Sequence, residues 1–285
     1  MADSRVTKEI ARYAKQTRVT DPGPMVSLYE GLPTDVAGLV KVVQNVFLHP
    51  FWAKRYGVTP TEEQEKHPMA RLVSRTLEMV TGFDPPPLTV SRPLEKRFFG
   101  NCRDHSTLLA SMLRHQGVPA RARCGFGAYF KPDHFEDHWI CEYWNGHRWV
   151  RVDAQLDEFQ RTRLKIDFDP LDMPKGKFVN ASDAWLKCRE GGEDADKFGI
   201  FDMHGLWFVR GNLMREIAAF CDAEMLPWDA WGLMKVDDAA LTLAQYDLLD
   251  RVARTLVGGD EGEMVRLYRA EEGLQVPPEM VVAGL

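Results

Sequence analysis

Apolar side chains recur at helical spacing over residues 1 to about 18, with Val6, Ile10 and Tyr13, which predicts an N-terminal amphipathic helix, and in three further stretches of the first half of the chain. The first follows a Thr34-Asp35 cap, the second runs from Thr61 to Val80, and the third runs from Cys102 to His115. Their pattern predicts three amphipathic helices, each with one buried face. The apolar positions are Val36, Leu39, Val42, Val43 and Val46 in the first, Met69, Leu72, Val73, Leu77 and Val80 in the second, and Leu108, Leu109, Met112 and Leu113 in the third.

The pattern changes after the third helix. Gly117 stands where a left-handed residue ends a helix, and the ranges Ala120 to Tyr129, Asp137 to Trp144 and Arg148 to Val152 are typical of strands. Asn145-Gly146 between the last two ranges predicts a two-residue hairpin, and therefore two antiparallel neighbours. The expected fold class is α+β, with a helix packed on an antiparallel sheet.

The rest of the chain is predicted to be mostly helical, after an ordered loop over residues 164–174. Helices are expected over Ala181 to Glu190, Asn212 to Met225, Asp238 to Val257 and Glu261 to Gly273. We therefore expect an N-terminal helical segment over 1–93 packing on a core over 94–178, and a C-terminal helical segment over 179–285. Four tryptophans of the last segment either form its core or line a pocket for an acceptor molecule: Trp185, Trp207, Trp228 and Trp231.

Composition and charge narrow the possible functions. Apolar residues make up 45% and charged residues 27% of the 285 positions, which is typical of a globular protein. The net charge of −6, without a basic run, argues against a nucleic acid partner. Residues 1–20 contain no apolar core of the signal-peptide type, and no later stretch reaches transmembrane length. We expect a cytoplasmic protein with no membrane partner.

The five cysteines are odd in number and widely spaced, so free thiols are expected rather than a disulfide framework. Cys102 differs from the others because it stands at the predicted start of a helix. Partial positive charge and unpaired backbone N–H groups at that position favour the thiolate, which is the nucleophilic form. The amide N–H of Cys102 could also hold a developing oxyanion, and Gly100 allows the backbone to approach closely.

An imidazole and a carboxylate would complete a catalytic triad with Cys102. His138 lies seven residues before the Asn145-Gly146 turn and Asp153 seven after it, so hairpin pairing brings them to similar heights. His134, in the preceding loop, is the competing base, and Asp153 could instead cap a strand end. A zinc site is a further alternative, with ligands Cys124, His134, His138 and Cys141.

This stretch resembles the core of the transglutaminase-like superfamily, which has a papain-like arrangement of Cys, His and Asp. The motifs that carry the resemblance agree in order and in spacing: Gly100-Asn-Cys102, Gly117-Val-Pro-Ala-Arg121, Gly125-Phe126, His138 with Glu142, and Gly146-His-Arg-Trp149-Val-Arg-Val-Asp153. The resemblance implies that Cys102 is the nucleophile, His138 the base and Asp153 the third member. Relatives have Trp two residues after the His, whereas here Trp139 follows it directly, which leaves open what packs beside the imidazole.

The superfamily includes proteases, glycanases, protein cross-linkers and amide synthases, so the resemblance leaves the substrate open. We expect a cysteine enzyme that hydrolyses an amide, peptide or ester bond through a thioester. The alternatives are transfer of the acyl group to an amine, and a binding protein that keeps the fold without turnover. No cofactor or metal is expected. The second oxyanion donor of relatives is often an aromatic or Gln side chain further upstream. The sequence does not place it here, and its candidates are Trp52, Phe98 and Phe99.

Overall fold

A computed structural model of the protein describes residues 9–82 and 86–282. The chain forms two compact units, which are described separately. Among the described residues, unit 1 consists of 9–82, 86–122 and 140–173, and unit 2 of 123–139 and 174–282. Within the described ranges, no helix combines the length and apolar character needed to cross a membrane. The three segments expected from the sequence, 1–93, 94–178 and 179–285, remain a prediction.

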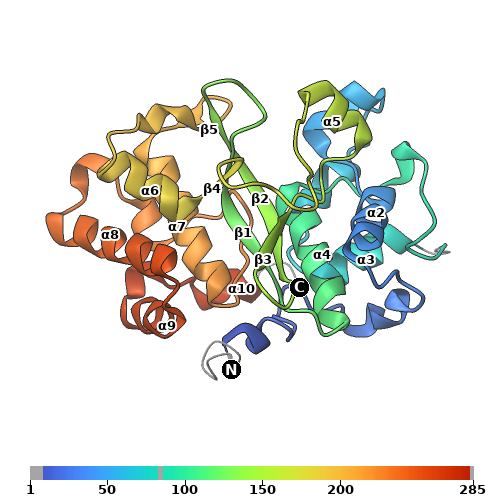
Figure 1. The fold of residues 1–285 in the computed structure, drawn as a ribbon, viewed down its shortest axis with the longest axis horizontal. Helices are drawn as coiled ribbons and strands as arrows, with labels where there is room; N and C mark the ends of the chain where they lie inside the picture. Colours follow the sequence, from blue (N-terminus) through green and yellow to red (C-terminus); the bar gives the residue numbers. More distant parts are fainter. Residues whose placement is uncertain (1–8, 83–85, 283–285) are drawn as a thin grey trace. The chain divides into compact units, whose positions relative to one another are not determined.

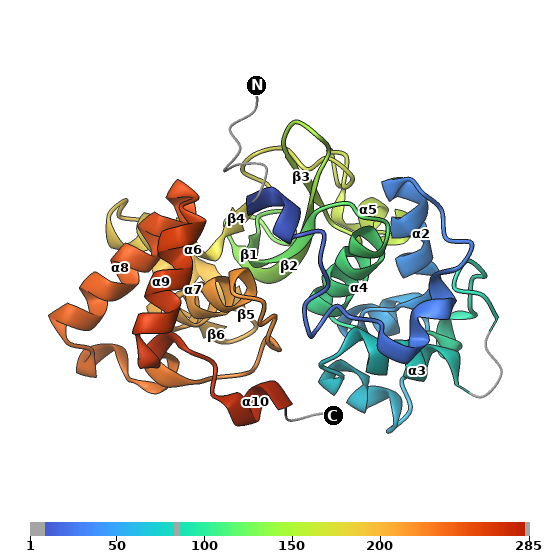
Figure 2. The same ribbon diagram turned by 90° about the horizontal axis from the view of Figure 1, so that it is seen from below.

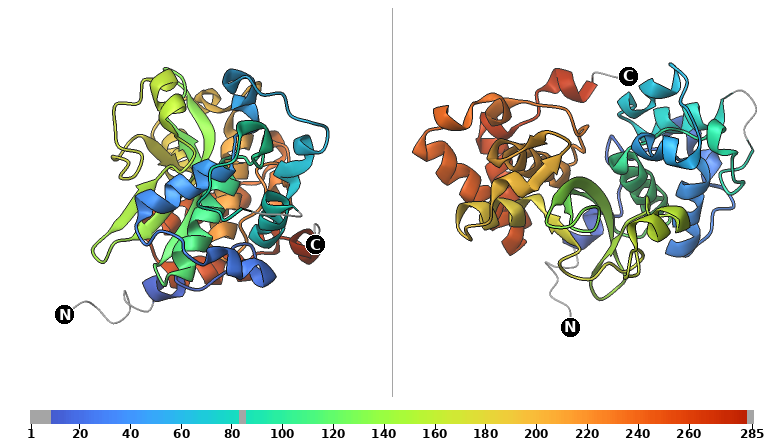
Figure 3. Two further views of the ribbon diagram at one scale, coloured as in Figure 1. Left: turned by 90° about the vertical axis from the view of Figure 1, so that its right-hand side faces the viewer. Right: turned by 90° about the horizontal axis from the view of Figure 1, so that it is seen from above.

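Unit 1 is built around one buried helix. This helix, α4, lies beside α2 and α3 (Figures 1 and 3). Its predicted stripe is confirmed, because all four apolar positions named above are at most 1% exposed. They share one core with the apolar face of α2 and with β3. After helical residues 9–12, the α-helices described in unit 1 are α2 (Val36–Val46), α3 (Val73–Thr81), α4 (Cys102–His115) and α5 (Glu158–Leu164). The 3-10 helices are η1 (Gly23–Tyr29), η2 (Pro50–Tyr56), η3 (Gln64–Met69) and η4 (Leu94–Lys96).

The single helix predicted over Thr61 to Val80 is wrong. The chain forms η3, an extended residue at Ala70, and then α3. Pro68 explains the break, because proline lacks an N–H and its ring clashes with the preceding turn. The apolar spacing continued through the proline and gave no sign of the interruption.

The sheet has six described strands in the order β4-β1-β2-β5-β6, with β3 paired to β2. The division between the units runs across β1 and β2. β2 is antiparallel to β3 and parallel to β5, so the sheet is mixed. Together with the helices it confirms the α+β class. The strands are β1 (Ala120–Gly127), β2 (Phe135–Trp144), β3 (Trp149–Val152), β4 (Phe178–Asn180), β5 (Phe198–Ile200) and β6 (Met203–His204).

The hairpin between β2 and β3 is confirmed, but its loop is longer than predicted. Trp144 pairs with Trp149, which leaves a loop over residues 145–148. The Asn145 side-chain oxygen accepts hydrogen bonds from the backbone N–H groups of His147 and Arg148 at 3.0 and 2.9 Å. That side chain stabilises a wider turn than the two-residue type.

Unit 2 contains a helical layer in which α6, α7 and α8 pack on one another, with α9 against α7 and α8 (Figure 2). Two of the four tryptophans, Trp185 and Trp231, are fully buried. Their indole N–H groups donate to Asp250 Oδ1 at 2.7 Å and to the Leu274 carbonyl at 2.9 Å. Trp207 and Trp228 are nearly half exposed. The α-helices are α6 (Ala181–Arg189), α7 (Leu206–Phe220), α8 (Leu243–Gly258), α9 (Glu261–Ala270) and α10 (Pro278–Val282). The 3-10 helices are η5 (Ala195–Lys197), η6 (Gly232–Lys235), η7 (Asp238–Ala240) and η8 (Glu272–Leu274).

Gly125 sets how closely β1 and β4 approach, which gives a first testable prediction. A Cβ at this position would lie 2.3 Å from the Val179 carbonyl oxygen and 2.9 Å from the Asn180 Cα. Both are backbone atoms of the paired strand, so they cannot move aside cheaply. Gly125→Ala is expected to lower the free energy of unfolding by about 1–3 kcal/mol in urea denaturation.

Gly258→Ala is the matched control, because a Cβ there meets nothing within 4 Å. It should leave stability unchanged or raise it slightly, since alanine favours a helix. Equal stability of the two variants would contradict the proposed close approach of the strands.

Candidate active site

Cys102 is the first residue of α4, as the sequence predicted. Asn101 caps the helix: its side-chain oxygen accepts from Asp104 N at 3.2 Å, while the Asp104 carboxylate accepts from Asn101 N at 2.9 Å. This reciprocal capping box fixes the point at which the helix begins. Cys102 is therefore held in the first turn, where the helix dipole favours an anion. The residue is only 7% exposed.

The backbone before Cys102 is tightly packed. A Cβ at Gly100 would lie 3.1–3.2 Å from side-chain atoms of Phe47, Phe98 and Asp104. The chain is crowded where it enters the helix, and this crowding is the reason for the predicted glycine at position 100.

The Asp104 carboxylate is buried together with the Arg103 guanidinium. Arg103 Nη1 lies 3.2 Å from Asp104 Oδ1, and Arg103 Nη2 donates to the Arg71 carbonyl at 2.7 Å. Burial raises the pKa of Asp104 to about 7, although Arg103 and the Asn101 N–H both act in the opposite direction. A carboxyl group that titrates near neutral pH therefore stands two residues after Cys102.

His138 lies on β2 in unit 2 and is 2% exposed. Its imidazole meets the edges of two aromatic rings from the β1–β2 connection. The Phe130 ring is 4.9 Å away and the Tyr129 ring 6.0 Å, both near-perpendicular to the imidazole. These are favourable edge-to-face contacts. They identify the side chains beside the imidazole, a question that the position of Trp139 had left open.

The strand is anchored to α7 at the residue before His138. Asn212 Nδ2 donates to Asp137 Oδ1 at 2.8 Å, and Arg215 Nη1 donates to Asn212 Oδ1 at 2.9 Å. Burial raises the pKa of Asp137, and the Asn212 hydrogen bond and the Arg215 charge partly offset that increase. This polar chain limits the movement of β2 next to the imidazole, and nothing in the local sequence pointed to it.

Asp153 is 1% exposed and directly follows β3. Its backbone N–H donates to the Pro170 carbonyl at 2.9 Å, and its Oδ1 accepts from Gln155 N at 3.0 Å. One oxygen of the Asp153 carboxylate therefore accepts a backbone hydrogen bond just after β3, which is part of the strand-capping role considered in the sequence analysis. Cys102 and Asp153 belong to unit 1 and His138 to unit 2.

Three further motif residues form one structural cluster in unit 1. The Glu142 carboxylate is buried and pairs with Arg121 Nη2 at 2.9 Å and with Arg151 Nε at 3.2 Å. The Arg121 guanidinium also lies over the Trp149 ring, 3.9 Å from its centroid. Arg121, Glu142 and Trp149 are thus held together by charge and by cation–π contact, which gives these motif residues a structural role.

Of the three candidates for the second oxyanion donor, the phenylalanines have no side-chain donor and their backbone N–H groups are already used. Phe98 N donates to the Val46 carbonyl at 2.9 Å, and Phe99 N donates to His67 Nδ1 at 3.1 Å. Burial lowers the pKa of His67, which keeps its ring neutral and able to accept that bond. Trp52 is one of the buried residues of η2, and its indole N–H remains the candidate for the second oxyanion donor.

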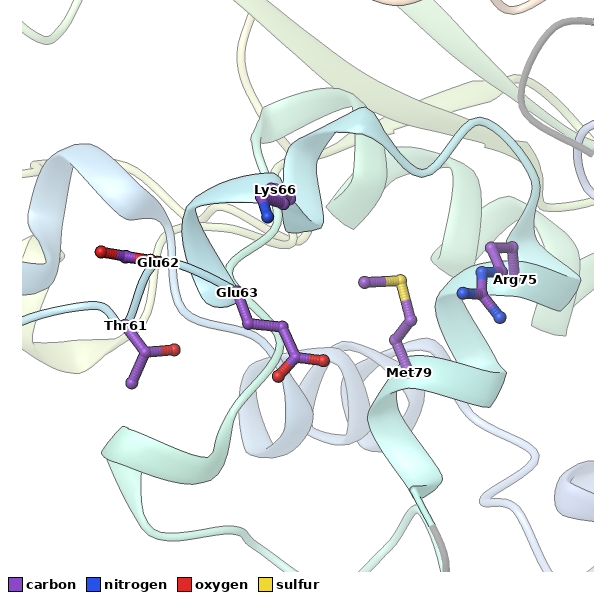
Figure 4. Close-up of a pocket in the computed structure, with 6 residues that line it drawn as sticks. All are labelled: Thr61, Glu62, Glu63, Lys66, Arg75 and Met79. Carbon is purple, nitrogen blue, oxygen red and sulfur yellow. The ribbon is translucent and has the colours of Figure 1, made fainter.

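Two other features bear on the alternatives. In the parts of the chain that the structure describes, no three His, Cys, Asp or Glu side chains are grouped to hold a metal ion. An open depression of about 750 Å³ lies between η3 and α3, and none of the predicted catalytic residues lines it (Figure 4). Its lining is Thr61, Glu62, Glu63, Lys66, Arg75 and Met79.

Comparison with known proteins identifies the fold. Residues 54–154 match the family model of the Transglutaminase-like superfamily, and this range contains Cys102, His138 and Asp153. The chain has a transglutaminase-like fold, which is found in a family of cysteine-dependent enzymes.

One solved structure is also similar, a "putative cysteine protease" from Cytophaga hutchinsonii. It is 17% identical, with a TM-score of 0.34, and the alignment covers 62% of this chain and 49% of that one. The match thus spans about half the length of that protein. No curated protein matches the chain.

The buried Asp104 carboxyl group leads to a prediction about stability and pH. Its pKa is about 7 in the folded protein and near 3.8 when unfolded, so the folded state binds a proton more tightly between these values. Asp104 should therefore lower the free energy of unfolding as pH rises from about 4 to about 7. Asp104→Asn removes this dependence while its side-chain oxygen can still accept the capping bond.

The measurement is urea denaturation at pH 4.5 and pH 7.5. From pH 4.5 to pH 7.5, the free energy of unfolding of Asp104→Asn should increase relative to that of wild type by on the order of 2–4 kcal/mol. Asp172→Asn, at an exposed ion pair with Arg148, is the control and should show no comparable gain. A constant difference between Asp104→Asn and wild type would contradict the raised pKa.

Proposed function

We propose that this protein is a cysteine hydrolase that cleaves an amide, peptide or ester bond through a thioester on Cys102. The observation that carries the proposal is Cys102 as the first residue of a capped, buried helix, inside the segment that matches the superfamily. A helix N-terminus stabilises a thiolate, and this effect has to outweigh the desolvation that burial imposes on the charged sulfur.

The chemistry follows two half-reactions. The Cys102 thiolate attacks the carbonyl carbon, a C–S bond forms, and the C=O π electrons move to oxygen. The Cys102 amide N–H donates to that oxyanion. The tetrahedral intermediate then collapses, the leaving amine or alcohol takes a proton from the His138 imidazolium, and a thioester remains. Water, deprotonated by His138, attacks the thioester and releases the acid and the thiolate.

Asp153 is the proposed partner of the His138 imidazole. The two positions lie seven residues on either side of Asn145-Gly146, and on that argument from the sequence they come to similar heights on the paired strands. A carboxylate beside the imidazole fixes its tautomer.

The buried edge-to-face contacts of His138 support its role over that of His134. Phe130 and Tyr129 restrict its ring rotation, which a general base needs if it is to keep its orientation through both half-reactions. The proposed substrate is a peptide or a small amide or ester. Transfer of the acyl group to an amine uses the same thioester, so the choice of acceptor is an outcome of the experiment below.

The reactivity of the thiols gives one prediction. Burial raises the pKa of Cys141 to about 12 and that of Cys188 to about 11, so both should be alkylated very slowly at neutral pH. Cys102 should react with iodoacetamide with an apparent pKa well below ~8.5. Peptide mapping after labelling between pH 5 and pH 9 measures the alkylation rate of each cysteine. Equally slow labelling of all five cysteines would contradict the enzyme proposal.

The acyl-enzyme gives a second prediction. Intact-mass analysis of wild type mixed with pools of amides and esters should detect adducts on Cys102, and Cys102→Ala should form none. His138→Ala should slow adduct formation by about 10²-fold or more at pH 7, because it removes the general base. His134→Ala is the matched control and should react at the wild-type rate.

Addition of a primary amine then distinguishes the acceptors. Hydrolysis predicts free acid as the main product, whereas a transamidase would give the amide of the added amine. A wild-type protein that forms no adduct with any pool, and that binds such ligands unchanged, would favour the binding-protein alternative.

A further inference from the structure

His105 forms a hydrogen bond to the peptide unit that carries the nucleophile. It lies on α4, three residues after Cys102, and is 3% exposed. Its Nδ1 is 2.8 Å from the Asn101 carbonyl oxygen. Because a carbonyl oxygen can only accept, Nδ1 carries the proton in this bond. The backbone N–H of His105 also donates to the same oxygen at 3.2 Å, so the oxygen accepts two hydrogen bonds.

That carbonyl and the Cys102 N–H belong to one planar peptide unit. Resonance links the two ends, so donors on the oxygen draw electron density from the nitrogen and make its N–H a stronger donor. Two donors on one oxygen also fix the orientation of the peptide plane. The Cys102 N–H is the group that would hold the oxyanion in the proposed reaction, and its direction matters because such donors act through preorganisation.

We propose that His105 is a positioning residue, which orients and polarises the Asn101–Cys102 peptide so that the Cys102 N–H stabilises the oxyanion. This inference rests on the proposed function and assigns His105 a role separate from that of the base. It acts through the peptide and does not contact the substrate.

The surroundings of the ring support a fixed orientation. Phe47 packs edge-to-face on it, with the ring centres 5.1 Å apart. The centre of the His49 ring is 6.3 Å from that of His105, and His49 is itself held by Phe51 N, which donates to its Nδ1 at 3.3 Å. All of these residues belong to unit 1, as do Asn101 and Cys102. A buried imidazole packed against these rings can keep its Nδ1 aimed at one carbonyl.

The next residue of the helix provides a comparison within the same turn. Ser106 Oγ donates to the Cys102 carbonyl at 2.8 Å, which is the same kind of bond one peptide further along. The Cys102 carbonyl forms one peptide unit with the Arg103 N–H, and this unit does not contain the Cys102 N–H. Loss of the Ser106 bond thus perturbs the first turn without altering the proposed donor. Comparing the loss of the Ser106 bond with the loss of the His105 bond therefore distinguishes an effect on helix stability from an effect on the polarisation of the Cys102 N–H.

The experiment uses two reagents that differ in one respect. Iodoacetamide alkylates a thiolate by displacement of iodide and forms no oxyanion. p-Nitrophenyl acetate acylates it through a tetrahedral oxyanion, forming the acetyl–sulfur bond and releasing p-nitrophenolate. The ratio of the two rate constants at Cys102, measured by intact mass with Cys102→Ala as background, reports stabilisation of the oxyanion separately from thiolate reactivity.

Four variants are compared with wild type. His105→Phe keeps an aromatic ring without the donor, and His105→Ala removes both. Each should slow acylation about tenfold, less than the loss of a whole oxyanion donor, while alkylation changes by less than about twofold. His105→Ser can donate to the carbonyl four residues back, as Ser106 does, and should restore acylation to within about threefold. Ser106→Ala should keep both rates near wild type.

The outcomes separate the two levels of the proposal. Wild-type acylation of Cys102 in His105→Phe and His105→Ala would overturn the role of His105 and leave the proposed function intact. An equal loss of both reactions would also overturn it, because His105 would then act on the thiolate or the fold. If wild type itself is never acylated at Cys102, the proposed function fails and this role fails with it. Should His105→Phe not fold, the Ser and Ala variants still decide.

Discussion

The hydrogen bonds exchanged between Asn101 and Asp104 are the constraint on which the candidate site depends. They set the first turn of α4, and so decide that Cys102 is the first residue of the helix, at the positive end of its dipole. A start one residue later would move the thiol out of the helix dipole and give the Cys102 N–H another environment. The charge of Asp104 opposes a nearby thiolate. Its raised pKa reduces this conflict below neutral pH, because the carboxyl group is then mostly neutral.

The residues that made the chain recognisable have different physical roles. Cys102, His138 and Asp153 have the chemistry of a triad, whereas Arg121 and Glu142 form a buried ion pair. A buried ion pair is costly to desolvate, and loss of one partner leaves an uncompensated charge. Loss of either residue would therefore destabilise unit 1, whatever reaction the protein catalyses. Agreement of a motif in order and spacing thus reports the architecture as much as the reaction.

The sequence predicted elements whose signals are local. α2 and α4 have continuous apolar faces and capping residues, so their starts at Val36 and Cys102 agree with the prediction. Strands β4, β5 and β6 were missed because two or three residues give no alternation to detect. Their pairing depends on distant strands. The break between η3 and α3 had a local signal in Pro68, which the apolar spacing around it outweighed.

The candidate site follows the same division. Placement of Cys102 came from the sequence, because a helix cap is a local feature. The anchoring of β2 through Asp137, Asn212 and Arg215 could not be predicted, since these residues are far apart along the chain and the contact depends on how α7 packs. The hydrogen bond from His105 to Asn101 was missed for another reason. It is local, but it depends on the rotamer of one side chain.

The hydrogen bond from Phe99 N to His67 makes the chain segment that precedes Cys102 sensitive to acid. His67 accepts the Phe99 N–H through Nδ1, and that acceptor is lost when the ring gains a second proton. Because burial lowers the pKa of His67, the folded state resists this protonation more than the unfolded chain does. Its contribution to stability is present above ~6.5 and declines as the solution becomes more acidic. Acidification would release the segment directly before Gly100 while the capped helix start beyond it stayed in place.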